Sequence, residues 1–318
     1  MSELFHLYRT SELSEGQLRG ICDLFEETFH HQKGPERFLK QFGNTGFDGG
    51  SYHVIAEEGG RVLATFSFIP YRYLLSGKEI KCVLGSDLIV SPEINLGIGG
   101  IASMYKLAAE RFKTEDFKFL FGFPNDNMYD YDKVVMRMSD ICILDFYVMP
   151  VNPGIVKKTL SCLQWLFYPC VRLAFAVCKA CSSAKKISFP IEKVDDGQFR
   201  RSRYDERHHF LKLSDGGDVV YTVYQEEKMP VAYILDITPM SPKNFYDAFL
   251  RVAAAVKKEA AVVAYPANKL PFFSPIRVPR RFLPRILHMV LKKIDRNVSD
   301  EVLDGKNWNM NLSNFDVR

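Results

Sequence analysis

The feature that most constrains the fold is a short glycine-rich connection between an apolar run and a helical pattern. Residues 80–91 are typical of a strand, the connection contains Gly97, Gly99 and Gly100, and a helix is expected from Ile101. A helix that begins directly after such a turn leaves several backbone N–H groups unpaired and pointing in one direction, and its dipole strengthens their attraction for anions. The segment therefore predicts a diphosphate site that needs no charged side chain.

The spacing of these glycines excludes the two commonest nucleotide-binding turns. Position 102 is not glycine, so the dinucleotide pattern G-x-G-x-x-G is not formed, and no Gly-Lys-Ser/Thr follows, so the turn is not a P-loop. The turn also follows several expected strands, whereas a Rossmann domain places it after the first. An ordinary loop with glycines at the start of a helix is the alternative interpretation.

The order of elements around the turn indicates an α/β fold with a sheet of mixed direction. A strand and two helices come first, three strands lead to the glycine turn and its helix, and two strands follow. The expected strands are 5–10, 51–57, 61–73, 80–91, 117–123 and 140–150, and the expected helices begin at Ser14 and cover 35–42 and 101–112.

The C-terminal half repeats the strand–helix–strand order and predicts a second domain of related topology. Its helix start is marked by Ser241 as N-cap and by Pro242 in the first helical position. No glycine turn follows the strands of this half, so we expect it to bind no cofactor. Strands are expected at 218–224, 230–237, 260–265, 287–294 and 308–312, with a helix at 242–259.

A basic, apolar segment separates the two halves and gives the boundaries 1–152, 153–186 and 187–318. No acidic residue lies between Asp145 and Glu192. The stretch from Thr159 to Cys178 is long enough to cross a bilayer, but Arg172 and Pro169 argue against insertion. We expect residues 155–181 to form one helix, bent at Pro169, with its apolar face buried between the domains. Docking on a membrane surface is the alternative.

Composition excludes several classes of protein. The chain has 318 residues, 47% of them hydrophobic and 25% charged, as in a globular protein with two cores, and its net charge of +4 is too small for a nucleic-acid binder. The seven cysteines include one C-x-x-C pair without a second ligand pair, so no metal site is expected. The N-terminus has no apolar signal region, and we expect a cytoplasmic protein.

Residues 86–112, SDLIVSPEINLGIGGIASMYKLAAERF, resemble the acetyl-CoA signature of the GNAT (GCN5-related N-acetyltransferase) family. Ser91, Pro92 and Glu93 match the end of the strand, and Gly97 and Gly99 match the glycines when one extra loop residue is allowed. Asn95 or Leu96 stands where the family has Arg or Gln. The resemblance covers residues 1–150, and the second half is similar to the degenerate second domain of tandem GNAT proteins.

The resemblance implies that acetyl-CoA is the co-substrate. Its diphosphate would lie on residues 96–101, and its thioester would lie between the splayed strands 80–91 and 117–123. A backbone N–H near Ile89 or Val90 would polarise the thioester carbonyl. The implied cofactor-binding residues are Ile89, Val90, Leu96, Gly97, Ile98, Gly99, Gly100, Ile101 and Asn125.

The same resemblance implies an acid and a base for amine acylation. Tyr129 and Tyr131 are the candidates for reprotonating the thiolate of CoA, and the alternative is that they lie on a solvated helix face. Asp87, Glu57 and His53 are the candidate bases, against the alternative that these strand residues are structural.

Three functions remain open at this point. The first is N-acetyl transfer to the amine of a small molecule or sugar. The second is tRNA-dependent aminoacyl transfer by a related tandem fold. The third is an interaction protein that keeps the fold with a decayed site.

Overall fold

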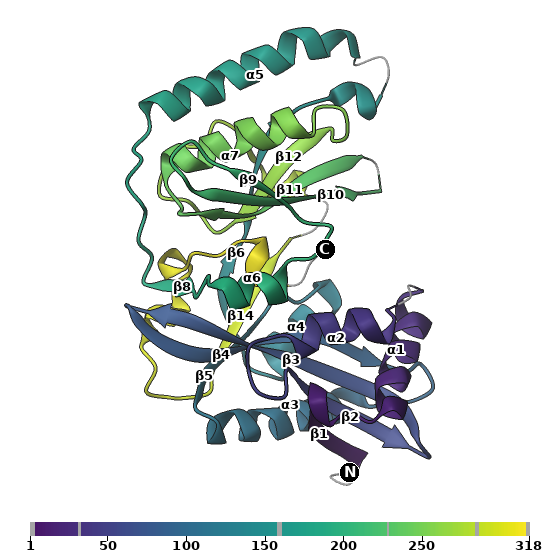
Figure 1. Ribbon diagram of the computed structural model, residues 1–318. Coiled ribbons are helices and arrows are strands. Elements are labelled where there is room, and N and C mark those ends of the chain that lie inside the picture. The colour runs from purple at the N-terminus through teal and green to yellow at the C-terminus, as the bar shows by residue number, and fades with distance from the viewer. Residues whose placement is uncertain (1–3, 31–32, 158–160, 228, 284–285, 316–318) are drawn as a thin grey trace. The chain divides into compact units, whose positions relative to one another are not determined.

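The computed structural model describes residues 4–30, 33–157, 161–227, 229–283 and 286–315, with side chains omitted for residues 161–166. The chain forms two compact units, and each unit gathers segments that are distant in the sequence (Figure 1). The first unit contains residues 1–142, 190–203 and 287–307, and the second contains residues 143–189, 204–286 and 308–318.

The first unit is built on a mixed sheet with the strand order β1-β2-β3-β4-β5-β14-β6, and β8 pairs with β3. Strands β4 and β5 run parallel, whereas β3 and β14 pair with them antiparallel. The strands are β1 (Phe5–Arg9), β2 (Tyr52–Glu58), β3 (Arg61–Leu75), β4 (Lys78–Val90), β5 (Phe117–Gly122), β6 (Ser139–Ile143), β8 (Ile191–Lys193) and β14 (His288–Lys293).

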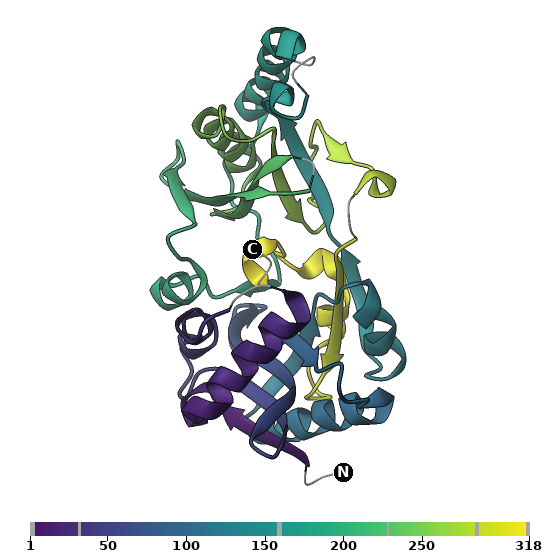
Figure 2. The ribbon, with the colours of Figure 1, turned by 90° about the vertical axis from the view of Figure 1, so that its right-hand side faces the viewer.

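Helices pack against both faces of this sheet (Figure 2). Successive side chains of a strand point to opposite faces. Tyr52 of β2 packs against Phe112 of α3, with ring centroids 5.1 Å apart, and the next residue, His53, packs against Phe38 of α2 at 5.2 Å. Helices α2 and α3 therefore cover opposite faces. The helices are α1 (Glu15–Phe29), α2 (Pro35–Gly43), α3 (Gly97–Thr114), α4 (Asp126–Val134) and α6 (Gly197–Arg203).

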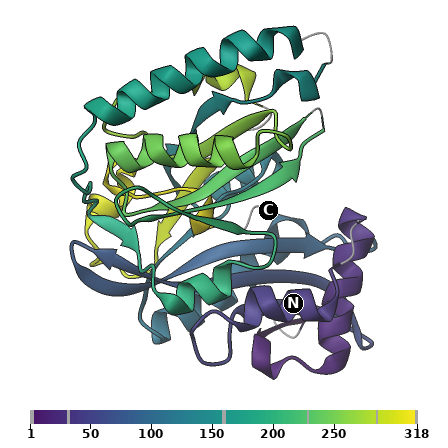
Figure 3. The same cartoon turned by 45° about the horizontal axis from the view of Figure 1, so that its top comes forward.

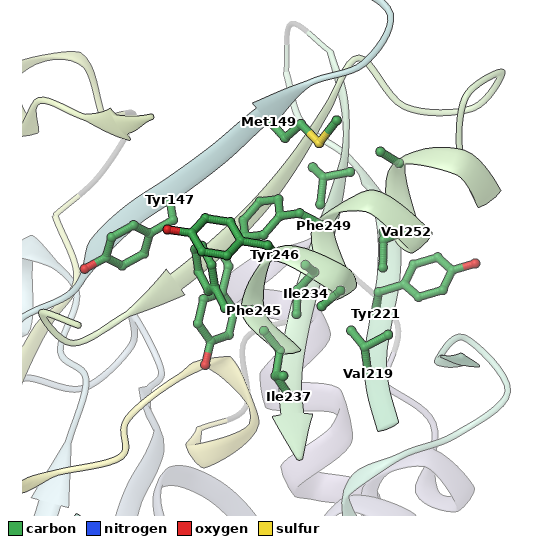
Figure 4. Close-up of a cluster of buried hydrophobic side chains, with 14 of the residues drawn as sticks. Tyr147, Met149, Val219, Tyr221, Ile234, Ile237, Phe245, Tyr246, Phe249 and Val252 are labelled. Carbon is green, nitrogen blue, oxygen red and sulfur yellow. The ribbon is translucent and has the colours of Figure 1, made fainter. Parts of the chain in front are cut away.

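The second unit has a sheet with the order β13-β7-β12-β11-β10-β9, in which β11 and β12 run parallel. Helix α7 (Pro242–Ala255) packs on this sheet, and α5 (Ser161–Cys181) runs alongside α7 (Figure 3). The core between α7 and the sheet is aromatic: the Phe245 ring lies 5.7 Å from that of Tyr147 and 4.9 Å from that of Phe249, between centroids (Figure 4). The strands are β7 (Asp145–Pro150), β9 (His209–Lys212), β10 (Asp218–Gln225), β11 (Pro230–Thr238), β12 (Val262–Ala267) and β13 (Arg277–Val278).

The two units exchange strands. The single strand expected at 140–150 is two strands, of which β6 joins the first sheet and β7 the second. The strand expected at 287–294 is β14, which completes the first sheet rather than the second. The first sheet thus takes two strands, β8 and β14, from residues 187–318, and the second sheet takes β7 from residues 1–152.

Two further expectations differ from the structure. Residues 308–312 form no named strand; Trp308 and Asn311 are isolated bridge residues, of which Asn311 pairs with Ala267, and a 3₁₀ turn begins at Leu312. The helix expected over 155–181 is preceded by a 3₁₀ turn at Pro153–Ile155, and α5 begins at Ser161 and contains Pro169. Residues 158–160 of that expected helix lie outside the described residues. Tyr168 and Phe175 bury the inner face of α5 in the second core.

Candidate functional site

The N-terminus of α3 has the features of an anion site. The helix begins at Gly97, and its N-cap, Leu96, offers no side-chain hydrogen bond to the first turn. The first N–H paired within the helix is that of Gly100, which donates to the Leu96 carbonyl at 3.0 Å. The Gly97 N–H donates to Asn95 Oδ1 at 3.1 Å. The N–H groups of Ile98 and Gly99 thus precede the helical ladder, in an exposed part of the turn.

The glycines of this turn have different roles. Gly97 has φ of +54°, which only glycine adopts without strain. A Cβ on Gly100 would lie 2.8 Å from Cβ of Leu96, so this glycine lets the first turn close. A Cβ on Gly99 would meet nothing within 4 Å. Gly99 therefore faces open space, where a ligand can approach the backbone.

Strands β4 and β5 separate just before this turn. Their last paired residues are Gly85 and Gly122, and β4 continues alone on that side to Val90. A parallel pair that ends in this way leaves backbone groups of β4 unpaired by β5. The structure thus has the splay that the GNAT resemblance implies.

The geometry distinguishes between the N–H groups of Ile89 and Val90. The Ser91 N–H donates to the Leu63 carbonyl of β3 at 2.8 Å, and Val90 lies opposite Ala64. In an antiparallel ladder, neighbouring residues direct their N–H groups to opposite sides. The Val90 N–H therefore points away from β3, toward the side on which β5 has separated, and the Ile89 N–H points toward β3.

Asp87 lies at a bulge in the same strand. Phe66 pairs with Leu88 and Ser67 with Ser86, so Asp87 is the extra residue, and its φ is +43°. Bulges of this kind are common beside active sites, where they redirect a side chain. The Asp87 carboxylate accepts a hydrogen bond from Nζ of Lys33 at 2.6 Å.

Lys33 was not singled out by its sequence position. Its side chain is only 8% exposed, and its ammonium lies 4.7 Å from the ring centroid of Phe25 and 4.8 Å from that of Phe42. The pair with Asp87 joins residues 54 positions apart. No local pattern in the sequence signals such a contact.

Helix α4 places the two candidate tyrosines in different surroundings. The Tyr129 hydroxyl donates to Asp140 Oδ1 at 2.7 Å, and this hydrogen bond raises the pKa of Tyr129. Its ring lies against His288, with centroids 4.2 Å apart. Both tyrosines pack partly against the apolar core of the first unit, so the hydrogen bond to Asp140 is what sets Tyr129 apart. Asn125 caps α4 by accepting the Met128 N–H at 3.0 Å.

The charged residues beside these tyrosines do not form a uniformly solvated face. Asp130 is exposed, but Asp132 is buried, and burial raises its pKa to about 7. A carboxyl with such a pKa is characteristic of acid–base groups as well as of structural sites. The helical register alone did not indicate this burial.

The remaining candidate bases differ in access. His53 is fully buried, with its ring nitrogens 2.9 Å from Thr10 Oγ1 and from Ser67 Oγ. Burial, followed by the charge of Lys33, lowers the pKa of His53 to about 3. A base must reach the proton that it removes, so His53 is structural. Glu57 is half-buried and accepts a hydrogen bond from Gln17 at 3.0 Å.

No family model and no curated protein sequence matches this chain. Solved structures do match over its length. A GCN5-related N-acetyltransferase from Kribbella flavida is 12% identical with a TM-score of 0.57, over 92% of this chain and 72% of that one. The corresponding protein from Anabaena variabilis is 11% identical with a TM-score of 0.56, over 92% and 73%.

N-myristoyltransferase from Saccharomyces cerevisiae, solved with bound myristoyl-CoA and inhibitors, is 12% identical with a TM-score of 0.52, over 91% of this chain and 80% of that one. These likenesses define the fold class: the chain has the GNAT fold, with two related domains. The expectation of a GNAT-like α/β fold with a related second domain is therefore confirmed.

Among the residues that the structure describes, no three His, Cys, Asp or Glu side chains are grouped to hold a metal ion. The described helices likewise include none with the length and apolar character to span a bilayer.

Proposed function

We propose that this protein is an acyl-CoA-dependent N-acyltransferase that transfers an acetyl group to the amine of a small molecule or sugar. The observation that carries the proposal is the uncapped, exposed glycine N-terminus of α3 beside the splay of β4 and β5. The matching structures are named as N-acetyltransferases and N-myristoyltransferases, which supports acyl transfer from coenzyme A.

The residues of this chain fit such a co-substrate. The diphosphate is held by the N–H groups of Ile98 and Gly99, where the helix dipole favours negative charge and Gly99 allows close approach. The thioester lies between β4 and β5, and its carbonyl oxygen accepts the Val90 N–H, which stabilises the negative charge that develops there. Leu96, Gly97, Gly100 and Ile101 shape the turn, and Asn125 starts α4 beyond the end of β5.

The proposed reaction is a direct acyl transfer. The amine forms a bond to the acyl carbon, the carbon–sulfur bond breaks, and the amine proton passes to a base, directly or through water. We prefer Tyr131 to Tyr129 as the proton donor to the thiolate, because the Tyr129 hydroxyl already donates its proton to Asp140. Asp87 remains a candidate base, and Glu57 is an alternative. A second role for Asp87 is to position the amine, because its carboxylate already holds the ammonium group of Lys33.

Calorimetry with acetyl-CoA, myristoyl-CoA and free CoA tests this proposal. Acetyl-CoA should bind with micromolar affinity, and release of free thiol should follow when an amine acceptor is added. Tighter binding of myristoyl-CoA would move the proposal to a longer acyl group. Absence of binding by all three would contradict it and favour a tRNA-dependent transferase or a non-catalytic protein.

A further inference from the structure

Lys33 places a buried ammonium group beside the open stretch of β4. Its side chain is 8% exposed, and Nζ lies 4.7 Å from the ring centroid of Phe25 in α1 and 4.8 Å from that of Phe42 in α2. The two rings attract the cation through their faces, which holds the ammonium group in place. One of its N–H groups donates to Oδ2 of Asp87 at 2.6 Å. The direction of this carboxylate is therefore set by a group that has little freedom to move.

The pair lies where the proposed thioester would be approached. Asp87 falls between Gly85, the last residue of β4 that pairs with β5, and Val90, where β4 ends. Lys33 contacts α1 and α2, and α2 covers the face of the sheet opposite α3, so the carboxylate lies on the face opposite the glycine turn. The side chain of Asp87 is 25% exposed, which leaves it open to an amine that arrives from this face.

Stability alone does not account for this pair. The φ of +43° at Asp87 is a left-handed conformation that residues with side chains rarely adopt, and such residues gather at active sites. A buried ion pair adds little to stability, because the cost of removing both charges from water offsets their attraction. Among the residues that the structure describes, neither Lys33 nor Asp87 has another ion-pair partner. A strained bulge and a buried pair at the splay therefore indicate control of geometry.

We propose that Lys33 is a positioning residue, which fixes the Asp87 carboxylate in the splay and thereby the place at which the acceptor amine is held. This role rests on the proposed acyl transfer, and Lys33 itself takes part in no covalent step. The ammonium group occupies Oδ2, and Ser86 Oγ makes only a long contact of 3.3 Å with Oδ1. A carboxylate oxygen accepts more than one hydrogen bond, so Oδ1 is left for the amine. Since Lys33 acts through Asp87, its effect should vanish when that carboxylate is absent.

A double-mutant cycle on the full chain tests this role. Thiol release from acetyl-CoA is measured with glucosamine, ethanolamine and benzylamine as acceptors. Lys33→Met keeps the length of the side chain among the rings but removes its charge, and it should lower kcat/KM for the amine at least about tenfold. Acetyl-CoA affinity, measured by calorimetry, should stay within about twofold of the wild type. In the Asp87→Asn background the same substitution should change kcat/KM by less than about twofold.

Phe25→Leu is a second variant, which loosens the ammonium group without altering either charge, and it should lower kcat/KM about threefold. Lys118→Met is the matched control: it breaks an ion pair of 3.0 Å with Asp295 at the start of β5, away from the splay, and kcat/KM should not change. Thermal unfolding shows that each variant is folded.

Absence of transfer by the wild type would overturn the proposed function and this role with it. Two results would overturn the role of Lys33 alone while transfer by the wild type persists. The first is that Lys33→Met and Phe25→Leu both keep the wild-type kcat/KM. The second is that Lys33→Met has the same effect with and without the Asp87 carboxylate.

Discussion

The two units use the same topology but end their central strands differently. In the first unit, β4 has one extra residue, Asp87, at a bulge before the strand ends, and β11 of the second unit has the equivalent extra residue, Leu235. A helix follows each strand, and a parallel strand follows each helix. These elements therefore occupy matching positions in the two units.

The helix that follows each bulged strand begins in opposite ways. α3 starts on glycines without a side-chain cap, whereas Ser241 caps α7 by accepting the Asn244 N–H at 3.1 Å. Pro242 has no N–H to offer, and both Ser241 and Asn244 are buried. When the backbone N–H groups of the first turn are already paired or absent, few remain to bind an anion.

The two units also differ in the space where the bulged strand separates from its parallel neighbour, β4 from β5 in the first unit and β11 from β12 in the second. The last β11–β12 pair is Tyr233 with Ala264. Beyond it, Asn311 Nδ2 donates to Asp236 of β11 at 2.9 Å and to the Tyr265 hydroxyl of β12 at 3.2 Å. The chain's own C-terminal segment thus bridges the second splay. The same strand pattern therefore leaves room for a ligand in one unit and is filled by the chain itself in the other.

The largest effect is expected from a charge at the start of α3. Gly99→Asp places a carboxylate where we propose the diphosphate, and repulsion should weaken acetyl-CoA binding about 30-fold or more. The fold should not suffer, because a Cβ there meets nothing within 4 Å and an acidic residue suits a helix N-terminus. Calorimetry measures the affinity, with Gly99→Asn as the neutral control of equal size. Unchanged affinity for the aspartate variant would place the diphosphate elsewhere.

Two buried carboxyls, one in each unit, should respond to the same substitution with opposite signs. Burial would raise the pKa of Asp247, but hydrogen bonds from Lys179, Ser214 and Arg251 lower it to about 2. A lowered carboxyl pKa stabilises the folded state above the ordinary value of 3.8 and loses this effect as the pH falls toward 2. Asp247→Asn should therefore lower the free energy of unfolding at pH 7 by about 2 kcal/mol, as measured by urea denaturation.

Asp132 should show the reverse. Its pKa is raised from 3.8 to about 7 by burial, so the ionised form costs stability above pH 7 and this cost disappears as the pH falls toward 3.8. Asp132→Asn should therefore raise the free energy of unfolding at pH 8 by about 1–3 kcal/mol and change it little at pH 4. If Asp132→Asn instead lowers the stability at pH 8, the ionised carboxylate of Asp132 must have stabilising partners in the folded state.

The smallest effect concerns the capped helix. Ser241→Ala removes the hydrogen bond to the Asn244 N–H and should cost about 1 kcal/mol of unfolding free energy. Acetyl-CoA affinity should be unchanged, because we place the site in the other unit. Urea denaturation and calorimetry on one preparation measure both quantities. A change in acetyl-CoA affinity without a change in stability would contradict the assignment of the binding site to the first unit alone.

The sequence carried the local features of this fold but not its long-range pairings. Ser14, Ser241 and Pro242 marked helix starts correctly, because caps are encoded within a few residues. The glycine turn and the strand before it were also local. The exchange of β7 and β14 was not predictable, since neither strand carries a signal of which sheet it joins. The contacts of Lys33 with Asp87 and of Asn311 with Asp236 could not be predicted either, because no local pattern in the sequence signals a contact between distant residues.

Hydrogen–deuterium exchange with and without acetyl-CoA observes both helix starts in one experiment and so tests whether only the start of α3 binds the co-substrate. We expect slower exchange in peptides that cover residues 88–101, where we propose that the Val90 N–H and the N–H groups of the α3 turn contact the co-substrate. Peptides that cover residues 236–246 should exchange at the same rate in both conditions. Protection at the start of α7, or none at the start of α3, would contradict a co-substrate site at the glycine turn of the first unit.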